Sequence, residues 1–258
     1  MPNDGGESTP PNSWLWRPLP RPEAALRLVC FPHAAGSPLV FRGWSEALPA
    51  EVELCAVRLP GRDNRLGETP YDEWRQLLDA LETVLAPTLA RPYALFGHSM
   101  GAMVAYELAR RLAERAARPA VRLLVAGCRG PDVPILVPAI HEMGAAEFKA
   151  NLGRVAGTPA EVVESPRWLK TFEPLLRADL KLAETWPPAA PSPVGIATTG
   201  FAGSDDPIAP PWSMRSWKRY ADPFVLRVVA GDHFFPHAAR TLLDPLSDEL
   251  RAALAETA

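Results

Sequence analysis

The chain lacks the features that mark membrane proteins and nucleic-acid-binding proteins. No apolar run among its 258 residues approaches the roughly 20 residues that a membrane-spanning helix needs. Lysine and arginine number 27 against 30 aspartate and glutamate residues, a formal net charge of −3, so no excess of positive charge is available for nucleic acid or an anionic membrane. We therefore expect neither of these as a partner.

Cysteine is also scarce. Cys30, Cys55 and Cys128 lie in or beside apolar runs without metal-ligand spacing, which predicts buried, reduced thiols in a cytoplasmic protein. The first 20 residues lack the basic region and apolar core of a signal peptide, and they are predicted to be a disordered leader. Residues 21–258, with an ordinary globular balance of 47% hydrophobic and 22% charged residues over the chain, are predicted to form one domain.

Six short aliphatic runs recur along the chain, and each ends in a turn signal. Their apolar character is nearly continuous, which is typical of strands covered on both faces. Helical patterns lie between them, with apolar stripes over 71–89 and from Val104 to Leu112. This alternation predicts an α/β fold with a mostly parallel, doubly wound sheet. The runs begin at Leu26, Val52, Tyr93, Val121, Val194 and Phe224.

The alternation breaks once, between Cys128 and Pro193. This stretch has helical periodicity but no convincing strand, and it is too long for an ordinary connector. We interpret residues from about 129 to 192 as a helical lid over the carboxyl ends of the strands, where such folds bind ligands. The alternative is a set of further packing helices of the main body. The proline-rich segment "ETWPPAAPSPV" predicts a rigid connector at the end of the insertion.

Ser99 stands at the boundary between a predicted strand and a predicted helix, in "YALFGHSMGAMVAYELARRL". The G-x-S-x-G pattern in this setting indicates a sharp turn that projects the serine hydroxyl from the sheet. The turn also directs the N–H groups at the start of the following helix toward the hydroxyl. A serine hydroxyl is a poor nucleophile, so a base and an acid should follow along the chain.

The base is expected where the run from Phe224 ends, in "AGDHFFP". His233 is the preferred candidate because it lies directly at the carboxyl end of a strand. His237 is the rival, although it falls at the start of the last helix and would point less directly into the site. Asp232, next to His233, is interpreted as structural.

The acid is expected where the run from Val194 ends, in "AGSDDP". Asp205 and Asp206 are adjacent, and strand alternation would send their side chains to different sides. A G-x-x-D turn places the acid three residues after Gly203, which favours Asp206 and leaves Asp205 as the alternative.

An oxyanion hole needs two backbone donors. The amide of Met100 is one candidate, and the loop "FPHAAGS" should supply the other, from Ala34 or alternatively Ala35. His33 and His98 have no carboxylate or cysteine at ligand spacing, so we expect structural histidines and no metal site.

Several blocks together resemble the type II thioesterases that accompany modular polyketide and non-ribosomal peptide synthetases. These blocks are "FPHAAGSPLVFRGW", "LPGRDNRLGE", "FGHSMGAMVAYELARRL", "LRADLKLAETW" and "AGDHFFPH", and the resemblance runs from about residue 26 to the end. It implies an α/β-hydrolase fold and hydrolysis of acyl thioesters on the phosphopantetheine arm of acyl or peptidyl carrier proteins, which frees stalled synthases. The family's catalytic positions fall on Ser99, Asp206 and His233, and its oxyanion amides on Ala34 and Met100.

The chain departs from the commonest family pattern at two positions. Ala35 stands where a second glycine is usual, which stiffens the loop and favours a fixed oxyanion hole. Trp186 stands where tyrosine is frequent, so the acyl chamber is expected to be narrower or lined differently. Lid residues Trp168 and Leu176 are expected to line the substrate slot, unless they serve only the packing of the lid helices.

The block "LPGRDNRLGE" carries charged side chains that could be mistaken for substrate contacts. Arg62, Arg65 and Glu68 are interpreted as ion pairs that fix a loop. The expected enzyme is a monomer without metal or organic cofactor. The alternatives are a carboxylesterase or lipase acting on oxygen esters, an acyltransferase, and a non-catalytic homologue that only binds carrier proteins.

Overall fold

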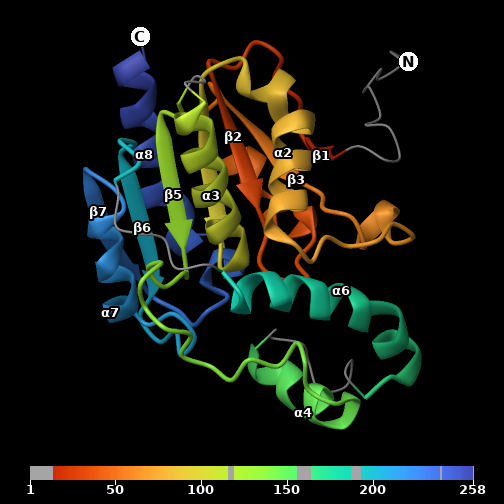
Figure 1. Cartoon of the computed structure of the whole chain (residues 1–258). Coiled ribbons are helices and arrows are strands. Elements are labelled where there is room, and N and C mark those ends of the chain that lie inside the picture. Colours follow the sequence, from red (N-terminus) through yellow and green to blue (C-terminus); the bar gives the residue numbers. More distant parts are fainter. Residues whose placement is uncertain (1–13, 116–118, 156–163, 187–192, 239, 258) are drawn as a thin grey trace, which may run out of the picture.

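The computed structural model describes residues 14–115, 119–155, 164–186, 193–238 and 240–257. Its centre is a sheet with the strand order β1-β3-β2-β4-β5-β6-β7, in which every neighbouring pair is parallel except β1 with β3 (Figure 1). The predicted α/β architecture is confirmed. The strands span Leu15–Trp16 (β1), Leu26–Phe31 (β2), Val52–Val57 (β3), Tyr93–His98 (β4), Arg122–Ala126 (β5), Thr198–Gly203 (β6) and Phe224–Val229 (β7).

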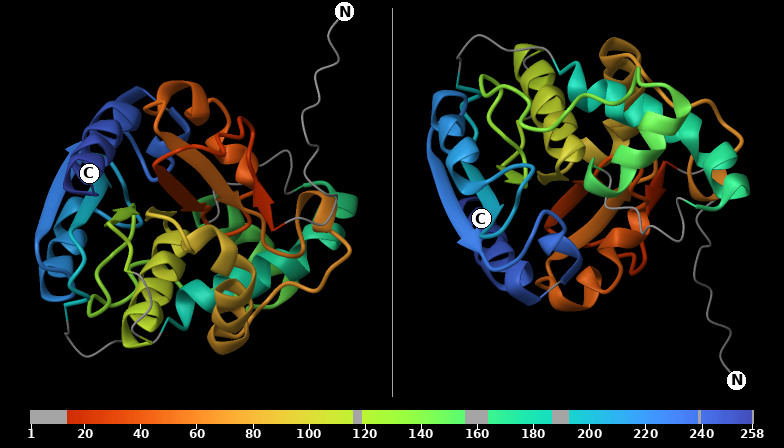
Figure 2. Two further views of the ribbon diagram at one scale, coloured as in Figure 1. Left: turned by 90° about the horizontal axis from the view of Figure 1, so that it is seen from above. Right: turned by 90° about the horizontal axis from the view of Figure 1, so that it is seen from below.

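Helices cover both faces of the sheet, which confirms the predicted doubly wound arrangement (Figure 2). Helices α2 and α3 lie on one face, and α1 and α8 on the other. Their bounds are Trp44–Ala47 (α1), Trp74–Leu89 (α2), Met100–Glu114 (α3) and Arg240–Thr257 (α8). The shorter elements are α7 (Pro211–Met214) and the 3₁₀ turns Pro38–Phe41 (η1), Asp63–Arg65 (η2), Arg215–Arg219 (η3) and Phe235–Ala238 (η4).

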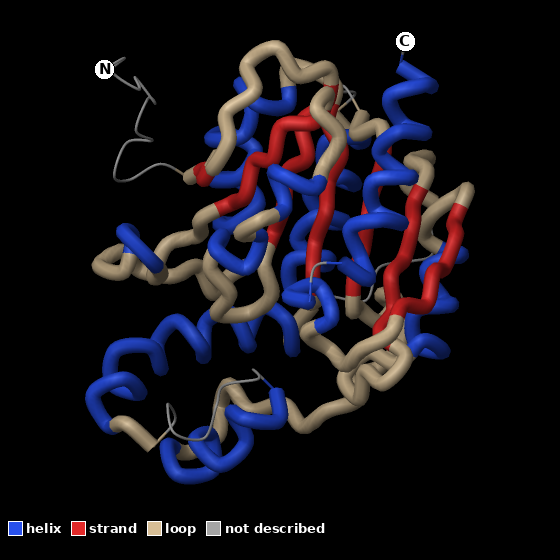
Figure 3. The backbone as a smooth tube through the Cα atoms, turned by 180° about the vertical axis from the view of Figure 1, so that it is seen from behind, coloured by secondary structure: helices blue, strands red, loops and turns tan. Residues whose placement is uncertain are grey.

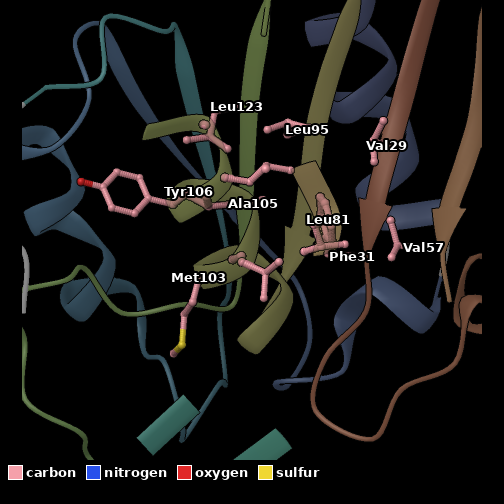
Figure 4. Packing of buried hydrophobic residues seen from close by; sticks show 14 of the residues in the cluster. Val29, Phe31, Val57, Leu81, Leu95, Met103, Ala105, Tyr106 and Leu123 are labelled. Carbon is pink, nitrogen blue, oxygen red and sulfur yellow. The ribbon is translucent and has the colours of Figure 1, made fainter. Parts of the chain in front are cut away.

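Each inner strand divides its apolar side chains between the two faces. In β2, Val29 and Phe31 pack with α2 and α3, whereas Leu28 and Cys30 pack with α1 and α8. Figure 4 shows the first of these clusters, which contains Phe31 of β2 and Leu81 of α2. Because both faces are buried, the inner strands need apolar residues at successive positions, and this is the continuous pattern seen in the sequence.

Strand β7 does not follow that prediction. It lies at the edge of the sheet, where β6 is the strand paired with it, and each of its residues is partly or fully exposed. Val225 and Val228 are 51% and 56% exposed. An apolar run therefore does not distinguish an edge strand from an inner one.

The predicted leader is too long at its C-terminal end. Leu15 and Trp16 form β1 and pair with Val57 and Ala56 of β3. The Arg65 guanidinium also stacks 3.9 Å from the ring centre of Trp14. These apolar side chains pack against the sheet. The packing orders this segment although the prolines near it disfavour regular structure. The rest of the expected leader, residues 1–13, lies outside the described residues.

The insertion after β5 contains the helices that its periodicity predicts. They are α4 (Ala145–Val155) and α6 (Pro166–Glu184), and they lie beyond the carboxyl ends of the strands (Figures 1 and 3). Helix α6 begins where the Ser165 side chain accepts a hydrogen bond from the Trp168 N–H and Pro166 occupies the first turn. The prolines of the predicted connector at 187, 188 and 191 lie outside the described residues.

Two further expectations from the sequence can be compared with the structure. The three cysteines are free and buried, as predicted. No helix in the described ranges is long and apolar enough to cross a membrane. The side chains of α4 and α6 form a cluster of their own, centred on Phe148, Leu152 and Leu176.

Candidate active site

Ser99 is the single residue between the end of β4 and the start of α3. Its φ of 55° and ψ of −119° are unusual for a residue with a side chain. The backbone is held there from both sides, because Ser99 N–H donates to Ala126 O at 2.9 Å and Ser99 O accepts from Ala102 N–H at 2.9 Å. Such strain persists only where the surroundings fix the chain, and it is common at functional sites.

The glycines that flank Ser99 are required by the close approach of the chain to itself. A Cβ atom on Gly97 would overlap the backbone of Gly101, and one on Gly101 would overlap the Phe31 carbonyl of β2. Neither glycine has a positive φ, so close packing, rather than conformational freedom, excludes larger residues here.

Two other strands deliver the predicted base and acid to the same edge. His233 follows β7 and Asp206 follows β6, and both side chains are almost fully buried. His233 Nε2 lies 3.0 Å from Ser99 Oγ, and His233 Nδ1 lies 2.8 Å from Asp206 Oδ2. With Nδ1–H donating to the carboxylate, the Nε2 lone pair faces the serine hydroxyl. The structure thus brings together the three predicted side chains.

Asp206 is held as a carboxylate. Burial works against its charged form, but the hydrogen bond and charge of His233 outweigh it and lower the Asp206 pKa. The N–H groups of Ile208 and Ala209 also donate to Oδ1, at 2.8 Å each. A carboxylate with these partners fixes both the orientation and the tautomer of His233.

The alternatives to these residues lie elsewhere. Asp205 is exposed and accepts a hydrogen bond from the Ser204 hydroxyl at 2.7 Å. His237 is exposed in η4 and contacts the rings of His33 and His98. Asp232 caps the following turn by accepting from Phe234 N–H at 2.8 Å, in line with its expected structural role.

The two histidines considered separately in the sequence are neighbours in space, together with a third. Ligand atoms of His33, His98 and His237 lie within 4.8 Å of one another. The His98 ring nitrogen Nε2 is 2.8 Å from His233 O, and His33 Nδ1 is 2.9 Å from Ala34 O. One nitrogen of each of these two rings is therefore engaged in a hydrogen bond to a backbone carbonyl that borders the site.

Two backbone N–H groups beside Ser99 suit an oxyanion. Within the described ranges, no protein acceptor bonds the N–H of Ala34 or Met100. Ala34 lines the same pocket as Ser99. The alternative donor, Ala35 N–H, is already engaged, because it donates to Asp179 Oδ2 at 2.6 Å. The geometry therefore favours Ala34 over Ala35.

Comparison with known proteins identifies the family. A family model described as "Thioesterase domain" matches residues 26–250. The chain belongs to the thioesterase domain family.

Individual relatives resemble the thioesterase over most of its length. Thioesterase PikA5 of Streptomyces venezuelae is 35% identical over 226 residues, 86% of this chain and 79% of PikA5. The structure of RedJ, a thioesterase from the prodiginine pathway of Streptomyces coelicolor, has a TM-score of 0.80, 36% identity and 92% coverage of each chain. YbtT, a type II thioesterase from the yersiniabactin pathway, has a TM-score of 0.84, 29% identity, and coverage of 94% of this chain and 100% of YbtT. The expected α/β-hydrolase fold and thioesterase family are confirmed.

A mostly apolar pocket opens beside Ser99. The main body contributes Met103, Gly127 and Ala209, and helix α6 contributes Leu180, Ala183 and Glu184. The loop after β5 adds Ile135, Leu136 and Val137. The pocket therefore lies between the strand ends and the insertion.

The lid residues predicted to line this pocket do not line it. Trp168 and Leu176 pack inside the cluster of α4 and α6, where the Trp168 ring is 5.1 Å from that of Phe172. Leu180 lies one turn after Leu176 on the same face of α6, and of the two it is Leu180 that lines the pocket. The packing alternative is the one that fits the structure.

Trp186 is likewise a core residue. Its Nε1–H donates to Glu107 Oε1 of α3 at 3.0 Å, and its ring packs near Tyr106 and Trp217. It anchors the C-terminal end of α6 to the main body instead of shaping the acyl chamber.

Among the pocket residues that the sequence did not reveal are Cys128 and Arg129. They follow β5 directly, and their position at the carboxyl end of a predicted strand was the signal that could have found them. Burial raises the Cys128 pKa to about 12, so this side chain remains a thiol. Arg129 donates to Val133 O at 2.5 Å.

The charged block after β3 fixes loops, as predicted. Arg65 and Glu68 pair at 2.6 Å within their own loop. Arg62 pairs with Asp179 of α6 at 2.9 Å, and both side chains are buried. Asp179 is a partner that the sequence did not reveal.

The packing of the turn predicts how glycine substitutions change stability. Gly101→Ala should lower the free energy of unfolding by about 2 kcal/mol, because the new methyl group overlaps the Phe31 carbonyl. Gly67→Ala is the matched control, since nothing lies within 4 Å of the added Cβ, and its effect should stay within about 0.5 kcal/mol. Urea denaturation of both variants measures the difference. Equal effects would contradict this account of the turn.

The histidines near the site predict a loss of stability in mild acid. Burial, with a smaller effect of His237, lowers the His33 pKa from 6.5 to about 3 in the folded chain. Below pH 6.5 the unfolded chain therefore takes up a proton that the folded chain does not. The free energy of unfolding then decreases as the pH is lowered. Between pH 7 and 5 this site should cost about 2 kcal/mol. His33→Gln should show a correspondingly smaller loss in urea titrations at the two pH values, and parallel losses would refute the assignment.

Proposed function

We propose that this thioesterase hydrolyses acyl thioesters on the phosphopantetheine arm of acyl or peptidyl carrier proteins. In this role it removes aberrant or stalled acyl groups from a polyketide or non-ribosomal peptide synthase. The observation that carries the proposal is the chain of hydrogen bonds Ser99–His233–Asp206 at the mouth of an apolar pocket. The similarity to YbtT, a type II thioesterase from a combined non-ribosomal peptide and polyketide pathway, supports the choice of substrate.

The first step is acylation of Ser99. His233 Nε2 accepts the hydroxyl proton as Oγ attacks the thioester carbonyl, and the resulting oxyanion accepts hydrogen bonds from Ala34 and Met100 N–H. Asp206 stabilises the imidazolium that forms. When the intermediate collapses, His233 returns the proton to the pantetheine sulfur and the thiol leaves.

The second step is hydrolysis of the acyl-serine. His233 removes a proton from water, which attacks the same carbonyl, and the same two N–H groups receive the second oxyanion. Collapse releases the carboxylic acid and returns the proton to Ser99 Oγ. All proton transfers run between the substrate, water and protein side chains, so the reaction as written uses neither a metal nor an organic cofactor.

The pocket suits an acyl chain on a long carrier arm. Leu136, Leu180 and Ala183 offer an apolar surface beside Ser99, while the thiol must leave toward the carrier protein outside. We assign α4 and α6 the role of a lid over this pocket. Every group in the mechanism comes from one chain, so a monomer suffices.

The substrate proposal is tested by comparing an acyl-pantetheine thioester, an acyl-carrier protein and the matched oxygen ester. We expect the two thioesters to be turned over faster than the oxygen ester. Ser99→Ala should lose hydrolysis of all three and retain carrier binding and folding. Preference for the oxygen ester without activity on acyl-carrier protein would indicate a carboxylesterase. Undiminished hydrolysis by Ser99→Ala would remove Ser99 from the mechanism.

The choice of acid is tested by two isosteric changes at adjacent positions. Asp206→Asn should lower kcat by roughly 10²- to 10⁴-fold, because the amide no longer holds the required tautomer or offsets the imidazolium charge. Asp205→Asn is the control and should keep nearly full activity, since that side chain is exposed. Steady-state hydrolysis of one acyl-pantetheine measures both, and the opposite ranking would exchange their roles.

A further inference from the structure

Asp179 of α6 is buried, and each of its two carboxylate oxygens accepts a hydrogen bond. One bond comes from the loop after β2, beside Ser99, and the other comes from the loop after β3. Its Oδ2 accepts from Ala35 N–H at 2.6 Å, and its Oδ1 accepts from Arg62 at 2.9 Å. Asp179 is 1% exposed and Arg62 is 2% exposed. Three segments far apart in the sequence thus meet at a single charge pair: the loop after β2, the loop after β3, and α6.

Arg62 also bonds directly to the loop after β2. Its Nη2 donates to Asp179, while its Nη1 donates to Gly36 O at 3.0 Å. The pair therefore holds the loop at two successive residues, Ala35 through its N–H and Gly36 through its carbonyl. Ala34, the second oxyanion donor of the proposed mechanism, immediately precedes this clamp.

Ala35 needs such a restraint. Its φ is 58°, a left-handed conformation that disfavours residues with a Cβ by roughly 1–2 kcal/mol. Because alanine resists the conformation, an outside interaction must hold it, and the Asp179 carboxylate supplies a charged acceptor for its N–H.

The same loop is also packed against the lid. Ala34 and Ala35 lie against the apolar cluster that contains Leu176 and Leu180 of α6. Asp179 stands between these two leucines in the sequence, so a movement of α6 would displace its carboxylate and its apolar contacts together.

We propose that Asp179 and Arg62 are positioning residues that set the oxyanion hole and make it depend on the docked position of α6. The inference rests on the proposed function, since it assigns Ala34 N–H to the oxyanion. In the docked state the clamp holds Ala35 left-handed and aims the Ala34 N–H at the carbonyl oxygen of the substrate. When α6 departs, the loop loses its acceptor and the hole loses one of its two donors.

Two variants that remove the charges test the pair, Asp179→Asn and Arg62→Gln. Each should lower kcat for acyl-pantetheine hydrolysis by about 10- to 100-fold, somewhat less than complete removal of an oxyanion donor, with KM nearly unchanged. The kcat of the double variant should be about equal to that of the less active single variant, because the two side chains act as one unit. Multiplicative losses would contradict a shared clamp.

Lys181→Ala is the matched control on the same helix. Lys181 joins α6 to Asp72 and Glu73 through exposed ion pairs at 2.9 and 2.8 Å, and among the described residues its ammonium pairs with none in the loop after β2. Its removal should leave kcat nearly unchanged. A loss equal to that of Asp179→Asn would mean that any weakening of the α6 attachment has this effect, and the specific role of Asp179 would be wrong.

A purely structural role is separated from a positioning role by inhibitor binding. A trifluoromethyl ketone analogue forms a tetrahedral adduct with Ser99 and places an oxyanion in the hole, whereas a thioether analogue does not. Asp179→Asn should weaken the ketone by the same factor as kcat and leave thioether affinity unchanged. Equal weakening of both inhibitors, or of neither, would overturn the proposal.

The wild-type chain provides a test that does not depend on the folding of a variant. Amide hydrogen exchange should protect Ala35 N–H as strongly as the amides of α6, because the two open together. Rapid exchange at Ala35 beneath a protected α6 would refute the coupling. If the wild type fails to hydrolyse any thioester, the proposed function fails instead; if it hydrolyses them and Asp179→Asn matches it, only this inference fails.

Discussion

The close approach of the chain at the turn around Ser99 is the constraint on which the rest of the site depends. Gly97 and Gly101 lie too near other backbone for any side chain to fit, and Ser99 adopts φ 55° as a result. This geometry lifts the hydroxyl from the strand and begins α3 at the next residue. The parallel sheet then does the remaining placement, since β6 and β7 end at the same edge and carry Asp206 and His233 there.

The protonation states of the buried groups around the site are set by their hydrogen bonds and their burial. Asp206 stays ionised because its hydrogen bonds overcome its burial, while the neighbouring histidines are held neutral and satisfy backbone groups. A second buried carboxylate, Asp179, links the insertion to the loop that carries Ala34. One carboxylate thus orients the base and another orients the loop beside it, each from a different part of the chain.

The sequence predicted those features that depend on local patterns. The inner strands, the turn at Ser99 and the ends of β6 and β7 all have short-range signals, so fold class and candidate triad could be anticipated. Contacts of α6 could not, because the place where the helix crosses the strand ends decides which of its residues reach the pocket. Leu180 lines it, whereas Trp168 does not, and Trp186, which follows the helix, packs in the core of the main body. Nor could the sequence show that Asp179 meets Ala35, 144 positions away. The exposure of β7 was missed because an edge strand and an inner strand share the same apolar composition.

The central claim is that Ser99 carries the acyl group between the two halves of the reaction. Rapid quenching of the wild-type enzyme with an acyl-pantetheine thioester, followed by mass spectrometry of its peptides, tests this directly. The account predicts an added acyl mass on the peptide that contains Ser99, appearing before the carboxylic acid accumulates and disappearing with it. Full turnover with no acyl group on Ser99, or with the acyl group on another residue, would contradict it.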